Sequence, residues 1–347
     1  MPTAALTRRA LLATVILTGF GLEDTASAQE HTLRMQTIFA EQTPSGQLIA
    51  QFVEDIETMS GGRVDIEMFY SSSVVKSVET FDAAASGILD GDFTGAAYLT
   101  GKNPAFQFVG DPMGGYDTPW QLYAWFYQAG GQELAEKLYE PYNMELVGWY
   151  IDSMESLSST KPVAGPADLK DWKFRSPPGL ETEIFEKLGS SPIVMDFTEV
   201  FTALETGIID GADASSLPDN IGLGLLDIAK HATYPGFHSM PADHLAIRKD
   251  MWDSLPEDLQ RIFEVGLQKF AFQTALAFEA ENARAAKEAE ARGVTLHDWS
   301  TEDRRAFRQA SLDAWETWAD RTPEAREIVD SHYEFMGLLG LTERQPE

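Results

Sequence analysis

The chain of 347 residues contains no cysteine, so disulfide bonds, thiolate metal sites and cysteine nucleophiles are excluded. Positive charge is also scarce, because 26 lysine and arginine residues stand against 55 aspartate and glutamate residues and give a net charge of −29. Such a chain lacks the basic surface that nucleic acid or an anionic membrane attracts, and we expect neither as a partner. A small anion held by one local cation is still compatible with this charge. The composition, 44% hydrophobic and 11% aromatic, is that of a globular protein of one large or two ordinary domains.

Long hydrophobic runs are absent beyond the N-terminal segment. There, "ALLATVILTGFGL" follows a pair of arginines and is too short to span a bilayer comfortably. The sequence "ASA" at residues 26–28 then matches the small-x-small pattern of a signal-peptidase site. We predict that residues 1–28 are a signal peptide, cleaved after Ala28, and that the mature chain works in the periplasm. A retained membrane anchor is the alternative, and the arginine pair leaves the Sec and twin-arginine export routes both open.

Strands and helices alternate in the first half of the mature chain. Residues 33–39 and 63–70 alternate apolar and polar side chains, which is typical of strands, and residues 45–62 carry apolar side chains at helical spacing. A helix over 78–91 and a short strand over 92–98 follow. The order βαβαβ predicts a parallel sheet flanked by helices.

The second half repeats this order of elements, from a strand at 172–176 to one at 212–216. The repetition extends to the letters themselves: "FDAAASGILDGDFTGA" at 81–96 and "FTALETGIIDGADAS" at 201–215 share Phe, Ala, Gly, Ile, Asp and Gly in register. Each phrase is interpreted as a helix end that a glycine terminates before a strand begins. Chance similarity is the alternative. The matching order of the surrounding elements favours two similar α/β lobes that close on a ligand like a clamshell.

From Pro256 onward the pattern is helical. Residues 256–293 predict one long helix that braces both lobes, and two further helices follow over 301–318 and 323–339. These last helices carry more aromatic surface than a simple tail needs, namely Phe307, Trp315, Trp318, Tyr333 and Phe335. Apolar surface on helices outside both lobes favours an interface, so residues 300–347 are predicted to pair two chains into a homodimer.

These elements divide the chain into predicted parts. Lobe one covers 29–152 and returns at about 240–255, lobe two covers 153–239, the bracing helix covers 256–293, and the C-terminal helices follow. The expected fold class is α/β, a two-lobed clamshell like that of periplasmic binding proteins, with a long bracing helix and C-terminal helices.

Several stretches, taken in order, resemble one protein family. "DLKDWKFRSPPG", "EKLGSSPIVMDFTEVFTALETGIIDGADA" and "RKDMWDSLPEDLQ" are similar to motifs of the DctP-like extracytoplasmic solute receptors of tripartite ATP-independent periplasmic (TRAP) transporters. A second set, "AYLTGKNPAFQFVGDPMGG", "WFYQAGGQELAEKLY" and "YPGFHS", resembles the branch that binds 2-oxo acids, lactate and related carboxylates. The resemblance covers nearly the whole mature chain. It implies a receptor that delivers an organic carboxylate to a membrane permease, and dimers through the C-terminal helices occur in this branch.

Arg175 is the residue expected to hold the ligand carboxylate. It ends an alternating strand and precedes the rigid turn Pro177-Pro178-Gly179, which places it at the crevice between the lobes. Its planar guanidinium can make two parallel charge-assisted hydrogen bonds to a carboxylate. The resemblance implies the same role, because an arginine at this strand end grips the ligand in the family.

The resemblance implies further ligand-binding positions. Tyr98 stands where the branch has a ligand-facing tyrosine, with a core position as the alternative. Phe237 is a second aromatic candidate, with packing as its alternative. Ala214 replaces a tryptophan of the branch, which enlarges the pocket and favours a ligand bulkier than pyruvate or lactate.

A cation beside the ligand is also implied. Asp213 matches a glutamate that helps to hold such a cation in the branch, and a carboxylate near a carboxylate ligand needs a cation or a proton. Ser239 replaces another glutamate and is the second metal candidate. The glutamine of the branch falls at about Met154, and Glu155 is the neighbouring position that can compensate. Whether Ca²⁺, Na⁺ or no cofactor is bound stays open at this point.

Two other function classes are alternatives. A secreted hydrolase would need paired acids or an activated nucleophile, yet no G-x-S-x-G elbow or phosphate-binding loop pattern occurs. His238 and His244 are six residues apart, which is not a helical metal pair, and they are interpreted as loop or packing residues. A ligand-sensing module for a signalling partner would use the same clamshell. The preferred hypothesis is a periplasmic receptor, not an enzyme, with a small organic acid and a TRAP permease as partners.

Overall fold

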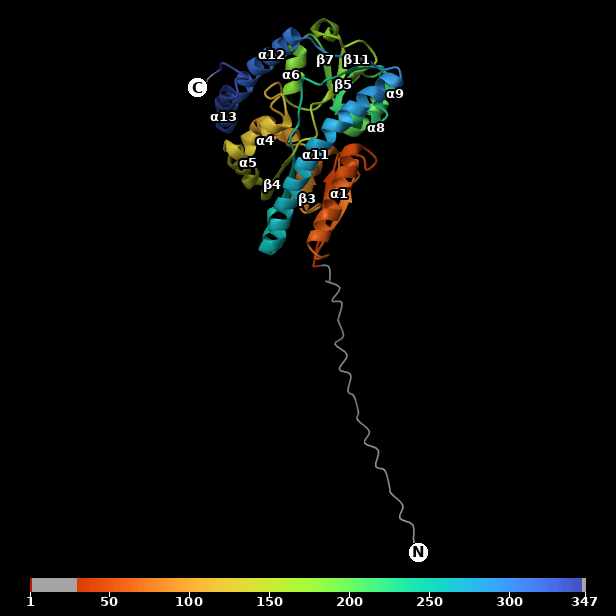
Figure 1. Cartoon of the computed structure of the whole chain (residues 1–347). Helices are drawn as coiled ribbons and strands as arrows, with labels where there is room; N and C mark the ends of the chain where they lie inside the picture. The colour runs from red at the N-terminus through yellow and green to blue at the C-terminus, as the bar shows by residue number, and fades with distance from the viewer. Residues whose placement is uncertain (2–29, 345–347) are drawn as a thin grey trace.

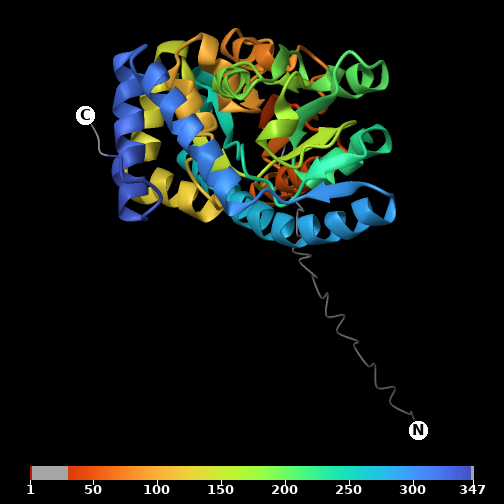
Figure 2. The same cartoon turned by 90° about the horizontal axis from the view of Figure 1, so that it is seen from above.

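The computed structural model describes Met1 and residues 30–344, so the predicted signal peptide beyond Met1 and its cleavage point lie outside the described residues. Figures 1 and 2 show two β-sheets with helices packed on both, and one long helix, α11 (Glu257–Ala291), that runs along both. The two-lobed α/β fold predicted from the alternation of strands and helices is confirmed. Within residues 30–344, none of the helices combines the length and the apolar character needed to cross a membrane.

The first sheet is mixed and contains five strands, β1 (His31–Thr37), β2 (Val64–Phe69), β3 (Gly91–Phe93), β4 (Met144–Tyr150) and β10 (Asp243–Arg248). Their order is β2-β1-β3-β10-β4. β1 pairs in parallel with β2 and β3, whereas β10 is antiparallel to both β3 and β4. Leu33 and Met35 in β1 are fully buried, as their alternation in the sequence predicts.

The second sheet contains six strands, β5 (Ser156–Ser159), β6 (Lys173–Ser176), β7 (Ser191–Val194), β8 (Gly211–Ser215), β9 (His231–Thr233) and β11 (Thr295–His297). Their order is β11-β9-β5-β8-β6-β7. β8, β6 and β7 are parallel neighbours, so their carboxyl ends meet at one edge of the sheet. Ligands of open α/β sheets bind outside such strand ends.

Helices cover both sheets. Those before the first passage between the sheets are α1 (Pro44–Met59), α2 (Thr80–Ala85), α3 (Ala105–Gly110), α4 (Pro119–Gln128) and α5 (Gly131–Tyr139). Later ones are α6 (Leu180–Lys187), α7 (Val200–Glu205), α8 (Leu217–Gly222), α9 (Leu225–Ile228) and α10 (Lys249–Ser254). α1 begins after Thr43, whose hydroxyl accepts a hydrogen bond from the N–H of Gly46, and Pro44 occupies the first turn, where no donor is needed.

The two copies of the repeated phrase have the same local structure. α2 ends before Gly87, at φ +83°, and α7 ends before Gly207, at φ +71°. The N–H groups of these glycines donate to the carbonyl oxygens of Ala84 and Leu204, and each segment then enters a strand, β3 or β8. The left-handed backbone that glycine adopts without steric cost ends both helices, and it ends α2 earlier than the predicted range of 78–91. The predicted strand at 92–98 is also shorter, since β3 gives way to a 3₁₀ turn at Ala96–Gly101.

The chain passes between the two sheets more than once. Residues 151–155 connect β4 to β5, and residues 234–242 connect β9 to β10. α11 packs against α1 and β4 of the first lobe and against α8 and β11 of the second, and Figure 1 shows it beside α1 at one end and near α8 and α9 at the other. The predicted bracing helix is therefore confirmed.

The C-terminal helices α12 (Thr301–Ala319) and α13 (Pro323–Leu338) lie against both lobes, whereas the sequence argument placed them outside both. α12 packs on α6, and α13 packs on α3 and α5; Figure 2 shows the pair in blue along one side of the molecule. Four of the five aromatic side chains that suggested a dimer interface are buried within the chain, namely Phe307, Trp315, Trp318 and Tyr333. They belong to the core, so the argument for an interface from exposed aromatic surface was wrong.

Candidate ligand-binding site

Arg175 lies near the end of β6 and is only 2% exposed. Its Nη1 donates a hydrogen bond to the carbonyl oxygen of Asp213 at 2.7 Å, and its Nε donates to the carbonyl oxygen of Met195 at 3.3 Å. The guanidinium carbon lies 5.9 Å from the centre of the Phe197 ring, and the Tyr98 hydroxyl contacts the guanidinium as well. These contacts fix the plane of the guanidinium, which has five N–H donors, and leave part of the fork for an anion.

A cavity of about 60 Å³ lies beside Arg175. This volume is room for about four or five water-sized groups. Both lobes line the cavity, because residues 95–98 after β3 and residues 213–214 of β8 both contribute to its wall. Five of the seven residues predicted to bind the ligand line it, namely Tyr98, Glu155, Arg175, Asp213 and Ala214, and Ser239 lines it too. The C-terminal ends of the two copies of the repeated phrase thus both lie at this cavity, one in each lobe.

Polar side chains form a connected, buried chain along this cavity. Ser239 Oγ lies 2.9 Å from Asp111 Oδ2 and 2.7 Å from Glu155 Oε2. Glu155 contacts Asp213, whose Oδ1 lies 2.9 Å from His238 Nε2. All five side chains are buried. Because charged carboxylates this close repel one another, the three acids must share protons or a cation.

Burial and repulsion shift the pKa values of these acids. Burial raises the pKa of Asp111 to about 8, and the charge of Asp213 contributes. Burial, followed by the charge of Asp213, also raises the pKa of Glu155 well above its usual value. For Asp213 itself burial favours the neutral form, but His238 and Arg175 outweigh it and hold the pKa below the usual value. The cavity therefore contains one acid that stays charged and neighbours that need protons or a cation.

The side chains present can hold a hard metal ion. Ligand atoms of Glu155, Asp213 and His238 lie within 4.8 Å of one another. Carboxylate oxygens, together with the hydroxyl of Ser239, are the type of ligand that Ca²⁺ and Na⁺ prefer. His238 is already bonded to Asp213, so it positions that carboxylate and need not be a ligand. The residues therefore fit the ion that the resemblance implies.

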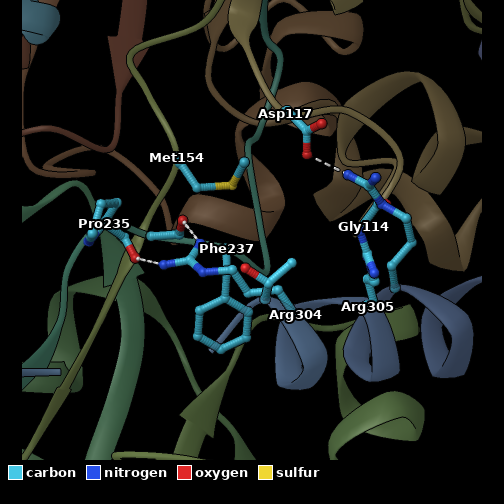
Figure 3. A pocket seen from close by; sticks show the side chains of 10 residues that line it. Gly114, Asp117, Met154, Pro235, Phe237, Arg304 and Arg305 are labelled. Atoms are coloured by element: carbon cyan, nitrogen blue, oxygen red, sulfur yellow. Dashed lines mark hydrogen bonds and ion pairs between the residues drawn. The ribbon is translucent and has the colours of Figure 1, made fainter. Parts of the chain in front are cut away.

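Met154 does not line the cavity beside Arg175. It lines a separate cavity of about 380 Å³ next to the start of α12, shown in Figure 3. Of the two candidates at the position of the expected glutamine, Glu155 and not Met154 faces the cavity with Arg175.

Phe237 also lies away from Arg175 and lines the second cavity with Met154 (Figure 3). Its ring stacks on Trp299 with 4.1 Å between the centroids, and the guanidinium carbon of Arg304 lies 5.6 Å from the ring centre. Arg304 further donates hydrogen bonds of 2.9 Å to the carbonyl oxygens of Pro235 and Gly236. Phe237 is therefore a packing residue, the alternative that its sequence context allowed, and it anchors residues 234–242 to α12.

Sequence reasoning missed Asp111, His238 and Asp243. Asp111 and Asp243 line the cavity. His238 was interpreted as a loop or packing residue, yet it is buried and bonded to Asp213. His244 is buried as well, with Nε2 3.0 Å from Asp92 Oδ2. For His238 and Asp243 the available signal was the density of polar residues in "HSMPADH", most of which lies in the second passage between the sheets.

Comparison with known proteins relates the chain to receptors. The family model described as "bacterial extracellular solute-binding protein, family 7" (DctP) matches residues 35–322. The chain is 27% identical over 286 residues to the monocarboxylate 2-oxoacid-binding periplasmic protein of a Nostoc species, a match that covers 79% of this chain and 76% of that protein.

Solved structures are similar too. A TRAP periplasmic solute-binding protein from Rhodobacter sphaeroides, in an open form without ligand, is 32% identical with a TM-score of 0.71, over 90% of this chain and 100% of that one. A TRAP solute-binding protein from Bordetella bronchiseptica is 22% identical with a TM-score of 0.82, over 89% of this chain and 92% of that one. That protein is a dimer with calcium and picolinate in one of its active sites. At its identity the likeness concerns the fold.

Proposed function

Because the chain belongs to the DctP family of bacterial extracellular solute-binding proteins, family 7, we propose that Arg175 and the cavity beside it bind the solute that the receptor delivers. The protein is a TRAP solute-binding receptor, and its relatives are periplasmic transport proteins. Its ligand is a small organic carboxylate, a 2-oxo acid, a 2-hydroxy acid or a bulkier monocarboxylate. The partner that accepts the ligand is a membrane permease, and the energy for transport comes from an ion gradient across that permease.

The observation that carries this proposal is a buried arginine beside a cavity that both lobes line. Carbonyl oxygens hold Arg175 in place, so its free donors meet a carboxylate without reorganisation. Tyr98 approaches from the first lobe and Asp213 from the second, which couples binding to closure. The Nostoc relative is named for 2-oxo acids and the Bordetella structure holds picolinate, which is also a carboxylate. A ligand bulkier than pyruvate, for which Ala214 leaves space, would hold the lobes further apart.

A cation beside the ligand is part of the same proposal. Asp213, Ser239 and Glu155 are the residues that would hold Ca²⁺ or Na⁺, and the ion would offset the repulsion between these acids and the ligand. The Bordetella protein contains calcium together with its carboxylate ligand, which supports this assignment.

A thermal-shift screen of small organic acids, with and without calcium, tests the function. An acid present at 100 times its dissociation constant is expected to add about 2.7 kcal/mol to the free energy of unfolding, since it binds the folded state alone. The amide of each acid is the matched control, because it keeps the shape but loses the charge that Arg175 receives. Equal shifts with an acid and its amide would contradict carboxylate recognition.

Export is expected to yield a mature chain that begins at Gln29. The motive is the small-x-small sequence at residues 26–28 after the apolar run. The intact mass of protein isolated from the periplasm measures the cleavage point directly. Material that retains Met1 would show that the segment stays as an anchor.

Three finer points stay predictions. The lobes are expected to divide near residues 152 and 239, with the return segment at about 240–255 in lobe one. Homodimer formation, which the Bordetella relative shows, now has no support from the buried aromatic residues of α12 and α13. That the chain is a receptor and not an enzyme is the third prediction, and it rests on its relatives, which are solute-binding proteins. A sensing role for a signalling partner is the alternative and would use the same cavity.

A further inference from the structure

Acidic side chains outnumber basic side chains in the lining of the cavity. Arg175 is the one lysine or arginine among the residues that line it. Four acids line it as well, namely Asp111, Glu155, Asp213 and Asp243, and each of them is at most 9% exposed. An incoming carboxylate would add a further negative charge to this set. A ligand that carries negative charge alone therefore leaves the cavity electrostatically unbalanced.

The charges are also distributed unevenly between the two lobes. On the side of the second lobe, Asp213 is close to Arg175 and 2.9 Å from His238 Nε2, so it has cationic partners. On the side of the first lobe, Asp111 follows α3 and Asp243 begins β10. Within residues 30–344, neither of these two acids forms an ion pair with a lysine, arginine or histidine side chain. The cavity thus has its one cationic side chain at one end and, at the other, carboxyl groups that need protons or a cation.

Ser239 lies between two of these carboxyl groups. Its single hydroxyl lies within hydrogen-bond distance of both Asp111 Oδ2, at 2.9 Å, and Glu155 Oε2, at 2.7 Å. A hydroxyl has one proton to donate, so it cannot donate to both carboxyl groups, and the other donor to Asp111 is the N–H of Met240, at 3.3 Å from Oδ1. A group with several N–H donors beside these acids would satisfy both.

We propose that the ligand is a small zwitterion, whose carboxylate binds Arg175 and whose protonated amine lies beside Asp111 and Glu155. This inference rests on the proposed function and specifies its ligand. An ammonium group has three N–H donors and one positive charge, which match the two acids and the oxygen of Ser239. Asp243, which lines the same cavity, adds negative potential at that end. The small cavity favours the size of a short amino acid, and the amine takes the place that a metal ion would otherwise fill.

Matched sets of acids that differ at one atom test the inference. Alanine, lactate and pyruvate form one set, and valine, 2-hydroxyisovalerate and 2-oxoisovalerate form a second. Binding of each is measured by calorimetry on the mature protein in excess chelator, and again with calcium. The amino acid of a set is expected to bind at least about tenfold more tightly than its hydroxy and oxo analogues, with no need for calcium.

Asp111→Asn provides the second arm of the test, because it keeps the shape and removes the charge. It is expected to weaken amino-acid binding by about tenfold or more, and to weaken hydroxy-acid binding by a clearly smaller factor. Asp117→Asn is the matched control. It removes the same charge from the chain, but Asp117 lines the other cavity, with Met154. Thermal melting of both variants verifies that they fold.

The outcomes separate this inference from the function beneath it. Tighter binding of a hydroxy or oxo acid, or binding that requires calcium, would overturn the zwitterion and leave the carboxylate receptor intact. No binding by either amino acid would overturn it as well. Equal loss for amino and hydroxy acids in Asp111→Asn would show that the side chain supports the cavity and does not receive an amine.

Discussion

Arg175→Lys is expected to weaken ligand binding by about ten- to a hundredfold and to leave the fold intact. Lysine keeps the positive charge but loses the planar fork, so the substitution separates geometry from charge. The loss of one charge-assisted hydrogen bond costs about 1.5–3 kcal/mol, which gives this range of affinity. Arg175→Ala is expected to cost more than about a hundredfold, because the bound carboxylate then has no counter-charge in a buried site.

Calorimetry on both variants, with the acid that the thermal-shift screen identifies, measures these losses. Arg305→Ala is the matched control, since it removes an exposed arginine that lines the second cavity and not the one beside Arg175. Wild-type affinity in Arg175→Ala would show that the carboxylate binds elsewhere. A similar loss in Arg305→Ala would show that the effect comes from total charge and not from a specific contact.

Trp315→Ala is expected to lower the free energy of unfolding by about 3–5 kcal/mol. The side chain is fully buried between the lobes' helices, edge-on to Phe108 and stacked on Tyr333 at 5.8 Å. Its Nε1 donates a hydrogen bond of 3.1 Å to the carbonyl oxygen of Met113, which the substitution leaves without a partner. The result is a cavity that joins α12, α13 and α3, and not merely a loosened C-terminal end.

Denaturant titration of the mature protein measures this loss. Phe272→Ala is the control, because that aromatic residue of α11 is 55% exposed and its removal should cost less than about 1 kcal/mol. Equal costs for the two substitutions would contradict the assignment of the C-terminal helices to the core. Loss of the α12 contacts would then be expected to matter only for association between chains.

The alternation of strands and helices could be predicted because each element carries its own period of apolar residues. Leu33 and Met35 fall on one face of a strand, and Gly207 marks a helix end, by local rules alone. The positions of α12 and α13 could not be predicted in this way. Their apolar faces were evident, but only the folded chain shows that Trp315 meets Phe108 from a segment about two hundred residues earlier.

Some residues of the candidate site could likewise be predicted from the local sequence, and others could not. Arg175 stands near the end of β6 and Asp213 lies in β8, so local pattern and the family resemblance sufficed to select them. Asp243 reaches the cavity only because residues 234–242 return the chain to the first sheet, and Asp111 reaches it from the irregular segment after α3. Phe237 illustrates the opposite error, because its neighbour His238 faces Asp213 while its own ring packs on Trp299. In an irregular segment, two neighbouring side chains can contact different surfaces of the lobes. No periodic pattern in the sequence predicts which surface each side chain contacts.

The order of strands in the first sheet also determines when this sheet can form during synthesis of the chain. β3 and β4 are not neighbours in that sheet, because β10 lies between them and pairs with both. Until residue 248 has emerged from the ribosome, each of these strands has an edge without its partner. The first lobe, although it begins the chain, can complete its sheet only after the second lobe's strands β5 to β9 have been made. A nascent chain of this topology therefore has an incomplete first sheet until more than two thirds of the chain have been made.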